Sequence, residues 1–98
     1  MEKSSPHYNL DAVKSLVRAG AVKIVFTAMR NALALGFEYQ DIVDAMLSLS
    51  RDDFYKSMTS YADHRSWQDV YHANTEAGTM YTKLTVQEKV LVLSFKEL

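Results

Sequence analysis

The sequence predicts an α+β fold, in which three N-terminal helices pack on one face of a C-terminal antiparallel β-sheet. Apolar residues in the first half recur at spacings of three and four, which is the period of an amphipathic helix. The second half is rich in aromatic and β-branched residues that alternate with polar ones, which is typical of strands. The chain has 98 residues and no internal repeat or low-complexity linker, so we expect residues 1–98 to form a single domain.

The first helix is indicated by Leu10, Val13, Leu16 and Val17, which share one helical face. Gly20 follows, at the position where a helix C-terminus favours a residue with positive φ. The next apolar segment, residues 22–26, could form a short strand or an extended linker.

The second helix is expected to begin after Thr27 as its N-cap and to end at Gly36. Its apolar positions are Ala28, Leu33 and Leu35. A third helix fits residues 40–49, with Asp41, Asp44 and Ser48 opposite an apolar face made of Ile42, Val43, Ala45, Met46 and Leu49. Ser50 followed by Asp53 resembles a capping box, which predicts one helical turn over residues 51–54.

Four strands are expected in the second half, over residues 54–60, 67–72, 78–86 and 89–97. A tight turn at Gln87 and Glu88 would join the last two and place Val86 opposite Lys89. This register pairs apolar residues on one face: Leu84 with Leu91, Thr82 with Leu93, and Met80 with Phe95. The opposite face would then present Tyr81, Lys83, Ser94 and Lys96 together, and a slip of one residue would exchange the two faces.

Composition excludes several classes of site. The chain has no cysteine, and His7, His64 and His72 lack the spacing of metal-ligand motifs, so we expect neither a metal nor another cofactor. The glycines are isolated, so no phosphate-cradling loop is indicated. No signal-peptide core or membrane-spanning run is present in the sequence, and we expect a soluble, cytoplasmic protein.

The net charge of −1 is unusual for a protein that binds nucleic acid. The charges are unevenly distributed, however. Residues 1–30 contain five basic and two acidic residues, whereas residues 31–53 contain one basic and five acidic residues. A local phosphate-binding face is therefore possible, and ordinary solvated charges remain the alternative.

Two segments combine polar and large apolar side chains in a way that suits a binding site. Residues 54–58 place Tyr55, Lys56 and Met58 on one expected strand, and Gln68 lies among aromatic residues on the next. The alternative is that the aromatic residues pack in the core or at an edge, while Lys56 and Gln68 are merely exposed.

Several strings resemble the MqsR family, which comprises mRNA-cleaving toxins of type II toxin–antitoxin systems. They are DFYKSM (53–58), WQDVY (67–71), the Tyr81-x-Lys83-x-Thr85-Val86 pattern, SFKE (94–97), and the N-terminal MEK-x-x-PH. The resemblance implies a RelE-like fold and ribosome-independent cleavage of single-stranded mRNA, typically at GC-containing triplets. It also implies an MqsA-type antitoxin as partner, with a zinc-binding part and a helix-turn-helix part.

The same resemblance identifies Lys56, Gln68 and Tyr81 as catalytic candidates. Tyr55, Met58 and Lys96 lie in the same motifs as candidate RNA contacts, and the predicted register adds Lys83. Without a metal, the substrate's own 2′-OH is the nucleophile, so the enzyme must assist proton transfer and stabilise phosphoryl charge.

Each residue type suits one of these tasks. Lys56 could stabilise the phosphate or, if neighbouring cations lower its pKa, act as base. Tyr81 could donate a proton with Lys83 or Lys96 nearby, and Gln68 could orient the 2′-OH or a phosphoryl oxygen. His7 is a possible auxiliary group. Two other functions remain open: a non-catalytic nucleic-acid-binding module, and a protein-interaction domain that docks through an edge strand or the acidic third helix.

Overall fold

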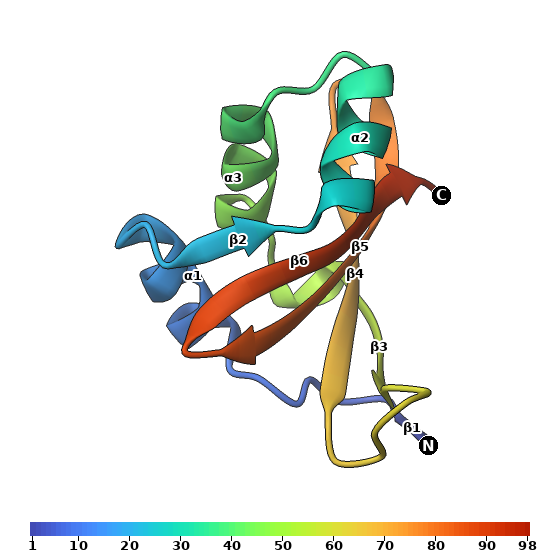
Figure 1. The fold of residues 1–98 in the computed structure, drawn as a ribbon. Coiled ribbons are helices and arrows are strands. Elements are labelled where there is room, and N and C mark those ends of the chain that lie inside the picture. Colours follow the sequence, from blue (N-terminus) through green and yellow to red (C-terminus); the bar gives the residue numbers. More distant parts are fainter.

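The computed structural model describes residues 1–98 and confirms the predicted α+β class with three α-helices, although the sheet has six strands rather than the four expected (Figure 1). The helices are α1 (Leu10–Arg18), α2 (Phe26–Ala34) and α3 (Tyr39–Leu47), followed by the short 3₁₀ helix η1 (Arg51–Asp53). The strands are β1 (Glu2–Lys3), β2 (Val22–Ile24), β3 (Phe54–Thr59), β4 (Trp67–Thr75), β5 (Gly78–Gln87) and β6 (Lys89–Glu97). None of the helices is long and apolar enough to cross a membrane.

The sheet has the strand order β1-β3-β4-β5-β6-β2, so two short N-terminal strands close its two edges. All neighbours are antiparallel except β2 and β6, which run parallel. Residues 22–24 are therefore a strand rather than a linker. The strand at Glu2–Lys3 was not predicted, because two residues are too short to show any periodicity.

The helix boundaries follow local capping interactions, with one prediction wrong. The N-cap of α1 is Asn9, whose side chain accepts a hydrogen bond from the backbone N–H of Ala12 at 2.9 Å. Thr27 is not the N-cap of α2, because the Val25 N–H donates to Val92 O at 3.0 Å and the helix begins directly after this extended residue. Inside α2, Leu33 points outward with 58% of its surface exposed.

The third helix is shorter than predicted and ends at Leu47, although Leu49 is still buried. The predicted capping box is confirmed at η1, where the backbone N–H of Ser50 donates to Asp53 Oδ2 at 2.9 Å. The predicted positive φ at the end of α1 is also confirmed, since Gly20 has a φ of 80°.

The predicted register of the β5–β6 hairpin is wrong, although its open face is confirmed. Glu88 alone forms the turn with a φ of 65°, so that Gln87 pairs with Lys89 and Leu84 with Val92. Leu91 therefore does not join the core. An unpaired Leu93 then shifts the register again, and the pairs beyond this bulge are Lys83 with Ser94, Thr82 with Phe95, Tyr81 with Lys96 and Met80 with Glu97.

The core lies between the three helices and one face of the sheet, which we call the covered face. Buried residues of all three helices pack there against strand residues that include Tyr71, Met80, Leu84 and Phe95. Buried Asp69 also lies on this face. Its carboxylate accepts hydrogen bonds from the backbone N–H of His7 at 3.1 Å and of Tyr8 at 2.9 Å. These charge-assisted bonds hold the segment between β1 and α1 against the sheet.

Candidate functional site

The other face of the sheet, which we call the open face, gathers most of the predicted site residues. Strand pairing places Lys56 of β3, Val70 of β4, Lys83 of β5 and Ser94 of β6 in one row across the sheet. The next row contains His72, Tyr81 and Lys96. Neighbouring strands are about 5 Å apart and successive rows about 7 Å, so long side chains of the two rows lie within reach of one another.

Lys56 is held in an ion pair across the edge of the sheet. Its Nζ lies 3.2 Å from Glu2 Oε2, and its side chain is 28% exposed. The hydrogen bond to Glu2 raises the pKa of Lys56, which keeps the ammonium group charged. This direction is opposite to the one that a lysine base requires, so the structure favours Lys56 as a fixed positive charge.

Lys83 has the opposite electrostatic environment. Burial lowers the pKa of Lys83, and the charge of Lys96 lowers it further. Val70, its neighbour in the row, is completely buried although it lies on the open face and outside the main core cluster. The open face therefore has a small apolar floor beneath its lysines, which explains the desolvation.

Tyr81 is placed beside a cation, as the hypothesis of a proton-donating phenol requires. Lys96 Nζ lies 5.3 Å from the centroid of the Tyr81 ring. Because the two residues are direct cross-strand partners, this proximity follows from the observed register. The ammonium group therefore lies near the aromatic ring, to which it is attracted electrostatically.

The remaining predicted residues extend the site toward the N-terminal edge. Gln68 pairs with Met58, which in turn pairs with Glu2. Gln68 lies four residues before His72 on β4, or about 13 Å along the strand, so it does not contact Tyr81 directly. The site is thus an elongated surface rather than a compact triad, which suits an extended strand of RNA.

Two histidines near the site lie on opposite faces of the sheet. His7 stacks on Trp67 with ring centroids 5.2 Å apart, and its Nδ1 lies 3.0 Å from Lys3 Nζ, so it belongs to the covered-face side of the N-terminal edge. His72, for which the sequence predicted no role, lies on the open face. It stacks on Tyr55, whose ring centroid is 4.4 Å away, and it pairs with Tyr81. Strand alternation from Gln68 through Val70 could have placed it there.

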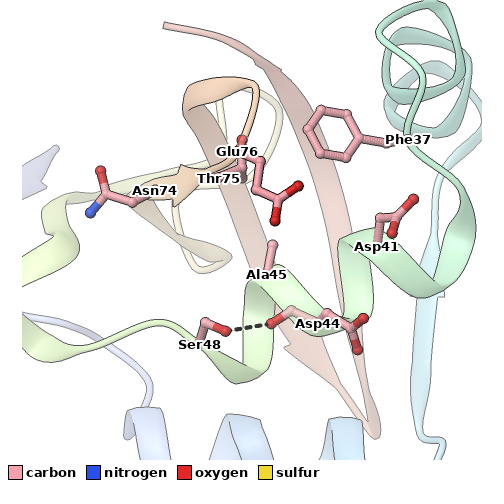
Figure 2. A pocket seen from close by; sticks show the side chains of 8 residues that line it. All are labelled: Phe37, Asp41, Asp44, Ala45, Ser48, Asn74, Thr75 and Glu76. Atoms are coloured by element: carbon pink, nitrogen blue, oxygen red, sulfur yellow. Dashed lines mark hydrogen bonds between the residues drawn. The ribbon is translucent and has the colours of Figure 1, made fainter.

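Three acidic residues line a groove elsewhere, between α3 and the turn that joins β4 to β5 (Figure 2). The groove has a volume of about 620 Å³ and is lined by Phe37, Asp41, Asp44, Ala45, Ser48, Asn74, Thr75 and Glu76. Helix α3 packs on the covered face, so these carboxylates lie across the sheet from the lysines. No three histidine or carboxylate side chains are close enough together to hold a metal ion.

Comparison with known proteins identifies the family to which the chain belongs. Residues 5–97 match the family described as "Motility quorum-sensing regulator, toxin of MqsA". The chain is also 47% identical, over 97 residues covering 99% of both chains, to the mRNA interferase toxin MqsR of Escherichia coli strain K12. Both findings confirm the resemblance inferred from the motifs on β3 to β6, and the chain belongs to the MqsR toxin family.

Proposed function

We propose that this protein is an endoribonuclease toxin that cleaves single-stranded mRNA without the ribosome. The observation that carries this proposal is the convergence of Lys56, Tyr81, Lys83 and Lys96 from three strands on one face with an apolar floor. The name of the E. coli relative, an mRNA interferase, supports the same substrate class. Cleavage of mRNA would stop translation and growth, and an MqsA-type antitoxin with zinc-binding and helix-turn-helix parts would neutralise the toxin in the cytoplasm.

The reaction follows from the residue types at the site. The substrate's 2′-oxygen forms a bond to phosphorus as the bond from phosphorus to the 5′-oxygen breaks, which leaves a 2′,3′-cyclic phosphate and a 5′-hydroxyl. The charged Lys56 stabilises the phosphoryl oxygens. Tyr81 donates the proton that the 5′-oxygen needs, and the neighbouring Lys96 stabilises the resulting phenolate.

Recognition uses the rest of the open face. Tyr55 is 52% exposed and offers a flat ring on which a base can stack. Met58 and Gln68 form the adjacent pair, in which the thioether contacts a base and the amide hydrogen-bonds the ribose or a phosphoryl oxygen. Lys83 adds a further contact to the RNA backbone.

The test is cleavage of a single-stranded RNA by the purified protein in the presence of a chelator, with Lys56→Ala, Gln68→Ala and Tyr81→Phe. We expect kcat/KM to fall about 100- to 1,000-fold for Lys56→Ala and Tyr81→Phe, and about 10-fold for Gln68→Ala. The matched control is Lys14→Ala on α1, which removes a lysine from a helix packed on the covered face and should change kcat/KM less than about twofold.

Two results would contradict the proposal. Folded wild-type protein that leaves RNA intact would reject the activity, and salt-dependent binding of that intact RNA would indicate a non-catalytic binding module instead. Unchanged cleavage by all three variants would reject the site while leaving the activity in place. Mapped 5′ ends of cellular RNA after induction would identify the preferred triplet.

A further inference from the structure

We propose that His72 is a further catalytic residue of this site, and that its imidazole accepts the proton of the attacking 2′-hydroxyl. This inference rests on the proposed ribonuclease function. Three observations carry it: the position of His72 between Tyr81 and the stacked Tyr55, a ring nitrogen without a hydrogen-bond partner, and the chemistry of the neighbouring residues.

The first observation is position. His72 is the cross-strand partner of Tyr81 and occupies the same row as Lys96. On its other side, β3 has an irregularity between Phe54 and Lys56, which sets Tyr55 over the imidazole. The imidazole therefore lies between a candidate proton donor and a candidate base-stacking residue.

The second observation is the unpaired nitrogen. His72 Nε2 is shielded from solvent and forms no hydrogen bond within the protein. Buried polar atoms of this kind are uncommon, because removal from water without a partner costs stability. A substrate hydroxyl or phosphoryl oxygen would supply the missing partner, so the cost borne by the free protein would be recovered in the complex.

Access to this nitrogen depends on Tyr55. The two rings are stacked with an interplanar angle of 26°, so Tyr55 covers one face of the imidazole. About half of the Tyr55 side chain is exposed, which leaves it room to move toward solvent. Stacking of a substrate base on Tyr55 would draw the ring away and bring the adjoining ribose to Nε2.

The third observation is the chemistry of the neighbouring residues. Lys56 is kept charged by Glu2, and Gln68 cannot transfer a proton near neutral pH. A neutral imidazole accepts and returns protons readily near neutral pH. The charged or titratable groups that face His72 come from four elements: Asp53 of η1, Tyr55 and Lys56 of β3, Tyr81 and Lys83 of β5, and Lys96 of β6.

The proposed step conserves atoms and charge. Neutral His72 takes the 2′-OH proton as the 2′-oxygen forms its bond to phosphorus, while the 5′-oxygen leaves with a proton from Tyr81. Imidazolium and phenolate are formed together, and exchange of one proton through water restores both groups. Neither an oxidant nor a metal ion is required for this balance.

The experiment measures single-turnover cleavage of an RNA with one scission site, from about pH 5 to about pH 9, for wild type and His72→Asn. We expect the wild-type rate constant to rise between about pH 5 and about pH 8, and we call this rise the acid limb of the pH profile. His72→Asn should lower the rate constant about 100-fold and flatten the acid limb. RNA affinity should fall much less than the rate constant, because the asparagine amide can still hydrogen-bond the substrate whereas it cannot accept the proton. The matched control is His64→Gln, which removes an exposed histidine from the β3–β4 loop and should retain both the rate constant and the limb.

Lys83 provides a second comparison, because its lowered pKa makes it the rival proton acceptor. Lys83→Met should retain the limb between about pH 5 and about pH 8 and alter the profile only at higher pH. Loss of the limb in Lys83→Met, with its retention in His72→Asn, would overturn the assignment. So would a folded His72→Asn variant with the wild-type rate constant.

If His72→Asn does not fold, NMR of the wild-type protein tests the proposal instead. The ring nitrogens of His72 are followed by NMR during titration with an RNA that keeps its 2′-hydroxyl groups but has a methylene group in place of the scissile 5′-oxygen, so that it cannot be cleaved. We expect the Nε2 resonance to shift as it gains a partner, and an unmoved resonance at saturation would overturn the proposal. Failure of wild type to cleave RNA would overturn the proposed function as well, whereas normal cleavage with an indifferent His72 would overturn this inference alone.

Discussion

The two faces of the sheet use the same strands for different purposes. On the covered face, Tyr71, Leu84 and Phe95 are excluded from solvent and pack against the helices. On the open face, Tyr81, Lys83 and Lys96, which alternate with them or directly adjoin them, remain accessible. Neighbouring residues of one strand therefore determine stability and chemistry separately, so each can be changed with little effect on the other.

The two faces also differ in the charged groups of the predicted site and of the groove beside α3. The open face carries lysines above a buried Val70, whereas the carboxylates of Asp41, Asp44 and Glu76 line the groove beside α3 (Figure 2). A chain with a net charge of −1 can thus present a local cationic surface to RNA. The net charge of the whole chain therefore does not describe this local surface, because it also counts the acidic side chains of α3, which packs on the covered face.

The largest expected difference between the faces is at Phe95 and Lys96. Phe95→Ala should lower the free energy of unfolding by about 3–5 kcal/mol, because Phe95 is fully buried and its ring contacts Phe37 edge-on at 5.3 Å. Lys96→Ala should change it by less than about 1 kcal/mol and weaken RNA cleavage instead. Urea unfolding and a cleavage assay on the same two proteins make the comparison. Equal losses of stability would show that the faces are not separable.

A smaller effect is expected from the ionisation of Tyr71 on the covered face. Burial and, to a smaller extent, the charge of Asp69 raise its pKa to about 12, although Arg51 opposes this shift. An unfolded chain loses this proton near pH 10, whereas the folded protein retains it, so stability should fall as pH rises from about 10 to about 12. Unfolding measured across this range should show a smaller decline for Tyr71→Phe than for wild type, and parallel declines would contradict the prediction.

The smallest effect is expected where the open face meets the N-terminal edge. Glu2→Gln removes the carboxylate that neutralises Lys56, so RNA affinity should rise about two- to threefold with little change in stability. The affinity for a non-cleavable RNA is measured for wild type and Glu2→Gln at low and high salt. The increase in affinity should become smaller as salt screens the charges. Weaker binding by Glu2→Gln would show instead that Glu2 positions Lys56 for the phosphate.

Local sequence was sufficient to predict the elements that depend on neighbouring residues. The apolar spacing around Val13 predicted α1, and the Ser50–Asp53 capping box predicted η1, because both depend on contacts within a few residues. The prediction of Thr27 as an N-cap was wrong because Val25 N–H donates a hydrogen bond to the carbonyl of the distant Val92. This interaction makes α2 begin before Thr27. The β1 strand was missed because its two residues have meaning only beside β3.

The hairpin register shows why part of the site was nevertheless predicted. Near the turn the true pairing differs from the predicted one by one residue, which moved Leu91 away from the core. Beyond the bulge at Leu93 the difference is two residues, which restores the predicted faces. Tyr81 and Lys96 therefore share the open face, as predicted, although they were not predicted to be direct partners.

The sequence by itself determined the element types, the family motifs and the alternation that separates Tyr81 and Lys83 from Met80 and Leu84, because these depend on side chains close along the chain. Only the tertiary structure decided the electrostatics of the site. Lys56 is held charged by Glu2, 54 residues away, and His72 lies between Tyr55 and Tyr81 because β3, β4 and β5 pair in this register. The pKa of Lys56 and the lack of a partner for His72 Nε2 depend on groups that are distant in the sequence. Strand pairing determines which of those groups lie nearby.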